Sequence, residues 1–189
     1  MYEGTLAELC TYRILRTNLI VISFCWSSTS VGFYGLAYVI KYLNGNIFLN
    51  AYSISAGEVF GKLSTICLLR CMSLRQILLL AFSISSFGLL LIIIFAENEA
   101  LMPWLLGLAR VGVSQAFVAL YLSIVLFYPT ILASTAIGVC VTVGKAATTF
   151  APMIAEAPAP ANLIIVMILT VLAAIVSQFL DTQRGFADG

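Results

Sequence analysis

The chain has 189 residues, of which 62% are hydrophobic and 9% charged, and its mean hydropathy is +1.09. This composition excludes an ordinary soluble domain and is typical of an integral membrane protein. The formal net charge is only +1, without the clustered Lys and Arg that phosphate backbones require. We therefore expect the lipid bilayer as a partner, and no nucleic acid.

Long apolar segments follow one another along the chain. A bilayer core about 30 Å thick is crossed by roughly 20 apolar residues in a helix. Helix breakers separate the segments: the Asn44-Gly45-Asn46 turn, the polar Glu97-Asn98-Glu99 loop, Pro129 and the segment 157–160. The pattern predicts an all-α membrane protein with six transmembrane helices, at residues 17–38, 47–69, 76–95, 102–128, 131–155 and 162–180.

The remaining residues complete a simple domain organisation. Residues 1–16 are interpreted as a polar lead-in that could lie at the membrane interface. Residues 17–180 form the predicted six-helix bundle, and residues 181–189 form a short polar tail.

Charged residues in the loops indicate the orientation. If the helices alternate in direction, five arginines lie on one side of the membrane and one lysine and three glutamates on the other. The arginine-rich side is the cytoplasmic side of a plasma membrane or the matrix side of the mitochondrial inner membrane, and it holds both termini. The two sets are Arg13, Arg16, Arg70, Arg75 and Arg184, and Lys41, Glu97, Glu99 and Glu156.

Ionisable residues at membrane depth are candidate functional residues. Glu58 and Lys62 lie four residues apart on one helical face. Two interpretations stay open, because they either neutralise each other as an internal pair or line a substrate cavity. Gly57 and Gly61 flank the same turn with a spacing that permits close helix contact.

Two further cations lie within predicted helices. Lys145 is near the middle of segment 131–155, and no acid on the last three helices lies at similar depth. Either Glu58 serves both lysines, or Lys145 faces water, a lipid headgroup or an anionic ligand. Arg110 is interpreted as a second unpaired cation, which either snorkels to the interface or binds a ligand. Aromatic residues could face the same cavity or simply pack, namely Tyr34, Tyr38, Trp26 and Tyr121.

Enzymatic and metal chemistry lack a recognisable basis in this sequence. It contains no nucleophile–base pair and no carboxylate dyad, and Glu58 is the only carboxylate within a predicted membrane span. The chain has no histidine, and its five cysteines lack metal-ligand spacing, so we interpret them as packing residues. We predict no enzyme, no catalytic residues, no metal and no cofactor, although a bound lipid or anion is compatible with the cations.

Three motifs in order carry a resemblance to a known family. They are Tyr34-Gly35-Leu36 with Asn44-Gly45-Asn46 and Phe48-Leu49 after it, then the segment Leu126-Phe127-Tyr128-Pro129-Thr130, then Asp181-Thr182-Gln183-Arg184-Gly185. From about Thr11 to Gly185 the chain resembles the C-terminal half of the organic-ion transporter branch of the major facilitator superfamily. The resemblance implies two inverted three-helix repeats.

The resemblance also implies roles for particular residues. Lys62 and Lys145 fall where organic-anion members carry a substrate-facing lysine and arginine. Other positions depart from the family, because segment 70–75 replaces its D-R-x-G-R-R loop, Leu126 its signature glutamate and Ala133 a following arginine. In the family these charges form a cytoplasmic network that locks one half against the other.

These departures shape the functional expectation. We expect a transporter-derived subunit that is structural and non-transporting within a larger membrane complex, for which respiratory-type assemblies are candidates. The alternative is a split secondary transporter for organic anions, completed by a separate N-terminal half or by homodimerisation. An incomplete reading of a longer protein is a third interpretation. In each, other membrane protein subunits or the N-terminal half cover the charged face.

Overall fold

The computed structural model describes residues 9 and 11–180, and within them all regular secondary structure is helical. The all-α prediction is thereby confirmed. The predicted 181–189 tail, with its Asp181–Gly185 motif, lies outside the described residues, as does most of the 1–16 lead-in. The elements in chain order are α2 (Arg13–Val39), η1 (Ile40–Tyr42), α3 (Ile47–Leu68), α4 (Leu74–Ile94), α5 (Met102–Phe127), α6 (Thr130–Thr148), α7 (Ala151–Ala155), α8 (Ala161–Val176) and η2 (Ser177–Phe179).

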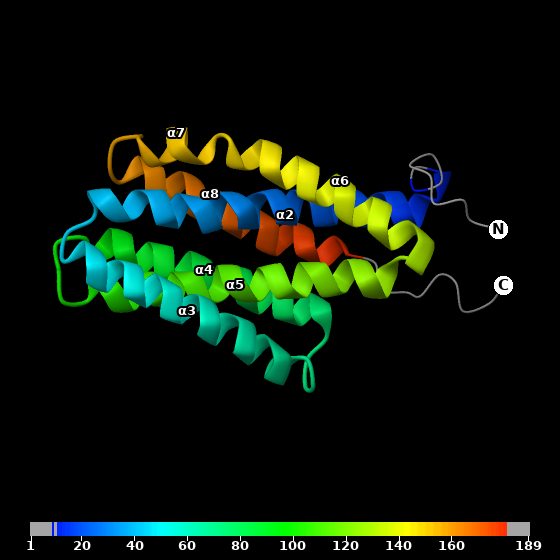
Figure 1. The fold of residues 1–189 in the computed structure, drawn as a ribbon, viewed down its shortest axis with the longest axis horizontal. Coiled ribbons are helices and arrows are strands. Elements are labelled where there is room, and N and C mark those ends of the chain that lie inside the picture. The colour runs from blue at the N-terminus through cyan, green and yellow to red at the C-terminus, as the bar shows by residue number, and fades with distance from the viewer. Residues whose placement is uncertain (1–8, 10, 181–189) are drawn as a thin grey trace.

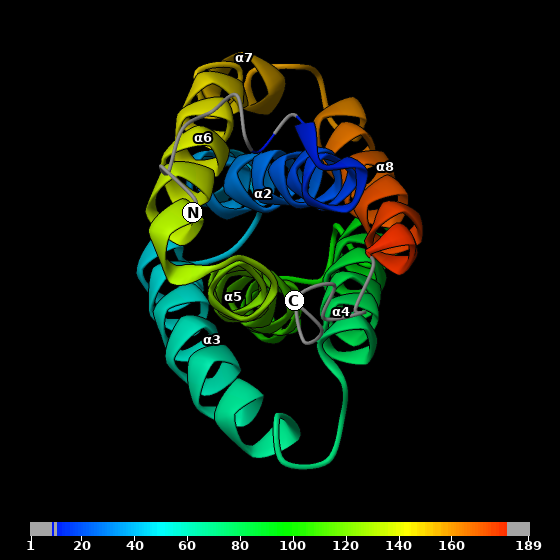
Figure 2. The ribbon, with the colours of Figure 1, turned by 90° about the vertical axis from the view of Figure 1, so that its right-hand side faces the viewer.

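Two central helices organise the bundle. Helix α5 packs between α3 and α4, α2 packs between α6 and α8, and α2 and α5 contact each other. Seen along the bundle in Figure 2, α4 and α8 lie on one side of this central pair, while α3 and α6 lie on the other. Helices α4 and α8 are in contact, which closes their side of the bundle. The side between α3 and α6 holds the candidate site described below.

The long helices run in alternating directions, and the short α7 continues in the direction of α6, as Figure 1 shows. Hydrogen bonds identify the segments that share an end. At one end the Tyr128 hydroxyl donates to the Leu15 carbonyl at 3.0 Å, and Arg75 Nε donates to the Leu180 carbonyl. At the other end the Asn44 side chain donates to the Ala96 carbonyl at 3.2 Å. The predicted 44–46 turn is present there.

Five segments in the described part of the chain are long and apolar enough to cross a membrane. Together with the composition, they establish a multi-pass integral membrane protein. Helix α3 has 22 residues but is not one of the five. Its Asn50, Glu58 and Lys62 lower its hydropathy, so the sixth predicted span remains a prediction. The five segments are Arg13–Tyr42, Leu74–Ile94, Met102–Phe127, Thr130–Ala155 and Ala161–Phe179.

Two predicted boundaries are corrected. Helix α2 begins at Arg13 rather than at residue 17, so the predicted lead-in overlaps its first turn. The predicted helix 131–155 is interrupted, because α6 ends at Thr148 and α7 starts at Ala151. Pro152 explains the interruption: proline has no N–H to donate, and its ring clashes with the carbonyl four residues earlier.

Helices α3 and α5 approach to backbone contact. A methyl group added at Gly61 would lie 2.6 Å from the Val111 carbonyl oxygen, and one added at Gly57 would collide with the backbone of Gly107. In a membrane, where lipid tails are as apolar as the side chains, such close approach is a main source of helix association. The contact therefore fixes which face of α3 turns towards α5.

Replacing Gly57 tests this contact directly. We expect Gly57→Ala to destabilise the protein by about 1–3 kcal/mol, because the added methyl group overpacks the interface. Gly138→Ala on α6 is the matched control, since a methyl group there would meet nothing within 4 Å. It should leave stability unchanged or raise it by up to about 1 kcal/mol through helix propensity. Thermal unfolding in detergent, followed by size-exclusion chromatography, compares the two; equal midpoints would contradict the proposed contact.

Candidate functional site

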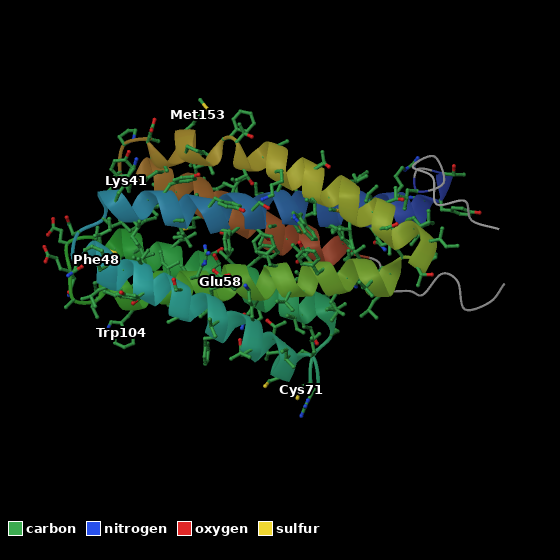
Figure 3. All side chains as sticks on the ribbon, in the orientation of Figure 1. Lys41, Phe48, Glu58, Cys71, Trp104 and Met153 are labelled. Carbon is green, nitrogen blue, oxygen red and sulfur yellow. The ribbon has the colours of Figure 1, made fainter. Side chains whose placement is uncertain are left out.

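A cavity of about 300 Å³ lies between α3 and α6, with α2 and α5 behind it. Its volume is at the small end of the roughly 300–1,000 Å³ range of small-molecule sites. Figure 3 places Glu58 about midway along the bundle, so the cavity is far from both ends. Four predicted site residues line it, namely Tyr34, Glu58, Lys62 and Lys145. The remaining lining residues are Trp26, Ser30, Phe33, Phe117, Val118, Tyr121 and Val141.

Glu58 holds two cations at once. Lys62 Nζ donates to its Oε1 at 2.6 Å, and Arg110 Nη2 donates to its Oε2 at 2.8 Å. The side chains of Arg110, Glu58 and Lys62 are 5%, 26% and 52% exposed, respectively. The carboxylate therefore joins a buried cation on α5 to an exposed one on its own helix.

The interpretation of Arg110 as an unpaired cation is wrong. Besides its ion pair with Glu58, Arg110 Nη1 donates to the Phe33 carbonyl at 2.6 Å. The guanidinium carbon also lies 3.2 Å from the centroid of the Phe33 ring, which is cation–π geometry. The side chain thus stays inside the bundle instead of snorkelling, because α2 and α3 neutralise and solvate it there. Of the three guanidinium nitrogens of Arg110, Nε is the one without a hydrogen-bond partner among the described residues.

Lys145 is placed differently from Arg110. Its ammonium donates to the Tyr34 hydroxyl at 3.0 Å and lies 5.1 Å from the ring centroid. No carboxylate pairs with Lys145 in the part of the chain that the structure describes. Glu58, the nearby carboxylate, pairs with Lys62 and Arg110 instead. The alternative in which Glu58 serves both lysines is therefore wrong. Lys145 is exposed towards the cavity and holds its charge beside an aromatic hydroxyl.

Aromatic rings form the back of the cavity. Trp26 and Tyr121 meet edge to face with centroids 4.5 Å apart, and the Phe33 and Phe117 centroids are 5.3 Å apart. Sequence reasoning named Trp26, Tyr34 and Tyr121 as possible cavity residues, but Tyr38 does not line the cavity. Helical spacing could have identified the others. Cavity residues recur four apart on all four helices, as in 26, 30 and 34, 58 and 62, 117 and 121, and 141 and 145.

The two cavity lysines occupy matching positions on their helices. Lys62 follows Ile47, the first residue of α3, by 15 residues, and Lys145 follows Thr130, the first residue of α6, by 15 residues. Each lysine directly follows a glycine that lies against a central helix: Gly61 against α5 and Gly144 against Trp26 of α2. The same local arrangement therefore presents one lysine from each flanking helix.

The charge balance of the site is positive. The site contains one carboxylate, Glu58, and three cations, Lys62, Arg110 and Lys145, so its formal net charge is two positive. An uncompensated cation in a partly apolar cavity favours an anionic ligand, since Coulomb attraction strengthens as the dielectric constant falls. Within the described residues no group of three His, Cys, Asp or Glu side chains could hold a metal ion. The chemistry that this geometry supports is anion binding against an aromatic wall.

Comparison with known proteins identifies the class of membrane protein. No family model matches the chain. Over 177 residues it is 27% identical to solute carrier family 22 member 21 of Mus musculus. The aligned region covers 92% of this chain and 31% of that protein. Over 182 residues, 94% of this chain, it is 27% identical to solute carrier family 22 member 4 of Mus musculus. It is 25% identical to organic cation/carnitine transporter 2 of Rattus norvegicus over the same length.

The chain is therefore related to the organic-ion transporters of solute carrier family 22, and the predicted resemblance to this branch is confirmed. It spans about a third of the length of the relatives that it matches. Its fold and its relatives together describe a transporter-derived integral membrane protein.

The ion-pair network predicts unequal roles for its two cations. Arg110→Met removes the buried partner of Glu58 and leaves the carboxylate with only the half-exposed Lys62. Breaking a buried pair typically destabilises by about 3–5 kcal/mol, which is the upper bound expected here because Lys62 remains. Lys62→Met removes a half-exposed cation, for which about 1 kcal/mol or less is expected. Thermal unfolding in detergent should therefore separate the two variants clearly.

A double variant tests whether the ion pair is the source of the stability loss. Adding Glu58→Gln to Arg110→Met removes the carboxylate that has lost its buried partner and should recover part of the lost stability. If the double variant is as unstable as the sum of the two single variants, the ion pair is not the source of the effect.

Proposed function

We propose that the cavity between α3 and α6 binds a small organic anion and forms one wall of the substrate path of a secondary transporter. The observation that carries this proposal is Lys145, a cation that faces the cavity and has no carboxylate partner among the described residues. Lys62, from the matching position on α3, supplies a second cation that is half exposed. A carboxylate bound between them would gain two charge-assisted hydrogen bonds.

The packing supports an architecture of two three-helix repeats that cross the membrane six times. Helices α2, α3 and α4 of the first repeat correspond in order to α5, α6 and α8 of the second. The contacts match under this correspondence: α3 packs on α5 as α6 packs on α2, and α4 packs on α5 as α8 packs on α2. The matching positions of Lys62 and Lys145 follow the same exchange. In this arrangement α3 is the sixth span; its Glu58 and Lys62 face the cavity, and its Asn50 is buried within the bundle. The described ends of the chain, at Arg13 and Leu180, then lie at the arginine-rich end, which the positive-inside rule makes cytoplasmic or matrix-facing.

The charged residues on the open side of the cavity need a protein partner that separates them from lipid. Charged side chains at the centre of a lipid-exposed helix cost about 2.5–3.5 kcal/mol each on a translocon-type scale. Glu58, Lys62 and Lys145 all lie on the face between α3 and α6. We propose that a second helical bundle covers this face, either an N-terminal transporter half or a second copy of this chain. Substrate binding near the midplane between two such bundles is the usual arrangement of secondary transporters.

The proposed ligand is an anion, whereas one relative is named for a cation. One relative is named for organic cations and carnitine. A simple cation would meet the charge of Lys145. Glu58, the one carboxylate among the described residues that line the cavity, is already paired twice. A ligand with a carboxylate fits better, and the aromatic wall of Trp26 and Tyr121 suits an apolar or aromatic body.

A structural role is the second candidate function. Leu126 and Ala133 are uncharged where the family carries a glutamate and an arginine. Arg75, in the same region, donates to the Leu180 carbonyl and so caps the end of its own bundle. The residues that would lock two transporter halves are thus absent or otherwise engaged. This observation favours a subunit that stays fixed within a larger membrane complex, with the cavity holding a lipid headgroup or another anion permanently.

Binding of small probes tests the anion proposal. Benzoate, trimethylglycine and tetraethylammonium represent an anion, a zwitterion and a cation. We expect benzoate to raise the unfolding temperature of the purified protein, and tetraethylammonium to have no effect. Lys145→Met should weaken benzoate affinity at least tenfold, because it removes the unpaired charge. Lys41→Met is the matched control, since Lys41 lies near the Tyr42 ring outside the cavity.

The outcomes separate the candidates. Protection by tetraethylammonium and not by benzoate, or equal benzoate affinity in Lys145→Met and the unchanged protein, would refute the anion site. Uptake of benzoate by vesicles that contain the protein and its partner bundle supports transport. Recovery of the protein only within a large assembly on native gels, with benzoate binding but no uptake, supports the structural role.

A further inference from the structure

We propose that Cys67 and Cys71, at the end of α3, are a paired site of S-acylation, at which long-chain fatty acyl groups are attached through thioester bonds. Both cysteines are free and exposed. Cys67 lies in the last turn of α3, and Cys71 lies in the turn that joins α3 to α4. This inference stands on other residues than the anion site and does not depend on it.

The two thiols lie on the side of α3 that faces away from the cavity. Cys67 follows Glu58 by nine residues, which is two and a half turns at about 3.6 residues per turn. Since Glu58 lines the cavity, Cys67 points to the opposite side of the helix. Leu63 and Phe60, one and two turns before it on the same side, are 59% and 65% exposed, respectively. This stripe is therefore more than half exposed and presents an apolar track for an acyl chain.

The position of the two cysteines at the end of a membrane helix also favours S-acylation. Figure 3 shows Cys71 at the outer edge of the bundle, in the turn after α3. Arg70 and Arg75 flank the turn, and both are among the arginines that the charge pattern predicts on one side of the membrane. Cysteines next to a membrane span on the cytoplasmic side are typical sites of reversible S-acylation, and basic neighbours favour anionic headgroups.

The other described cysteines make the assignment specific. Cys25 and Cys140 are both fully buried. The Cys25 thiol lies 3.6 Å from the Ala173 carbonyl oxygen, and the Cys140 sulfur lies 3.4 Å from the Ser23 hydroxyl. Neither can reach an acyl donor without unfolding of its helix contacts. The four thiols thus divide into two packing residues and two accessible ones.

The reaction is an acyl transfer without any redox change. The Cys67 or Cys71 sulfur attacks the carbonyl carbon of a long-chain acyl-coenzyme A, held by a membrane acyltransferase. A new carbon–sulfur bond forms as the bond to coenzyme A breaks, and the cysteine proton passes to the coenzyme A thiolate. The attached chain can then lie along Phe60 and Leu63 in the lipid phase.

Thioester-specific labelling tests the site in the full chain expressed in a eukaryotic cell. Free thiols are blocked with N-ethylmaleimide, thioesters are cleaved with hydroxylamine, and the released thiols are tagged with a maleimide polymer that shifts the gel mobility. Cys10 lies outside the described residues, so it is replaced by serine in every variant. We expect a hydroxylamine-dependent shift that is lost in Cys67→Ser/Cys71→Ser and kept in Cys25→Ser/Cys140→Ser.

Three results would overturn the proposal. These are the absence of any hydroxylamine-dependent shift, a shift that survives in Cys67→Ser/Cys71→Ser, and a shift that appears after reduction with dithiothreitol alone, which would indicate a disulfide. Serine at two exposed positions should leave the unfolding temperature unchanged, and this measurement excludes misfolding as the cause of a lost shift. Benzoate binding should also be unchanged in this variant, so acylation and anion binding can fail separately.

Discussion

Arg110 is a permanently charged group on the central helix α5, and the surrounding bundle is arranged to keep it there. Its guanidinium reaches the Glu58 carboxylate on α3 and both the carbonyl and the ring of Phe33 on α2. A buried cation without such partners would be expelled or would distort the helix. One side chain therefore links three helices that are far apart in sequence, and it fixes the depth and rotation of Glu58. The cavity owes its shape to this link, because Glu58 and Phe33 form part of its lining.

The close contact between α3 and α5 completes this constraint. Gly57 and Gly61 bring the two backbones together, so that Glu58, one residue after Gly57, is carried to the edge of the interface where Arg110 can reach it. A bulkier residue at either position would move α3 outwards and lengthen the ion pair. Because α3 buries only a narrow stripe against α5, its other surfaces remain available. One surface carries the charged residues of the cavity, and the opposite one carries the apolar stripe that ends at the two cysteines.

The sequence was informative about features that depend on local pattern. Apolar length, the Asn-Gly turn and the prolines located the helices to within a few residues, and i, i+4 spacing paired Glu58 with Lys62 correctly. It failed for Arg110, because its partners Glu58 and Phe33 are 52 and 77 residues away, and a single sequence does not reveal which helix faces it. The same limit applies to the bond between Lys145 and Tyr34, which are 111 residues apart. Periodicity identifies a polar face, but only tertiary packing decides what that face meets.

The distribution of charge along the bundle separates two tasks that a transporter combines. Holding a ligand needs charge at membrane depth, where Glu58, Lys62, Arg110 and Lys145 are present and geometrically organised. Locking two halves together needs charge at the membrane surface, where Leu126 and Ala133 offer none and Arg75 caps its own bundle. The two sets of charges differ in how much they affect stability. A charge at membrane depth needs a polar or oppositely charged partner at all times, whereas an exposed surface ion pair contributes about 1 kcal/mol or less. We therefore expect the fold to tolerate loss of surface charge more easily than loss of the Arg110 network. The interior network by itself is consequently weaker evidence for transport than the unpaired Lys145, which packing within the described bundle does not require.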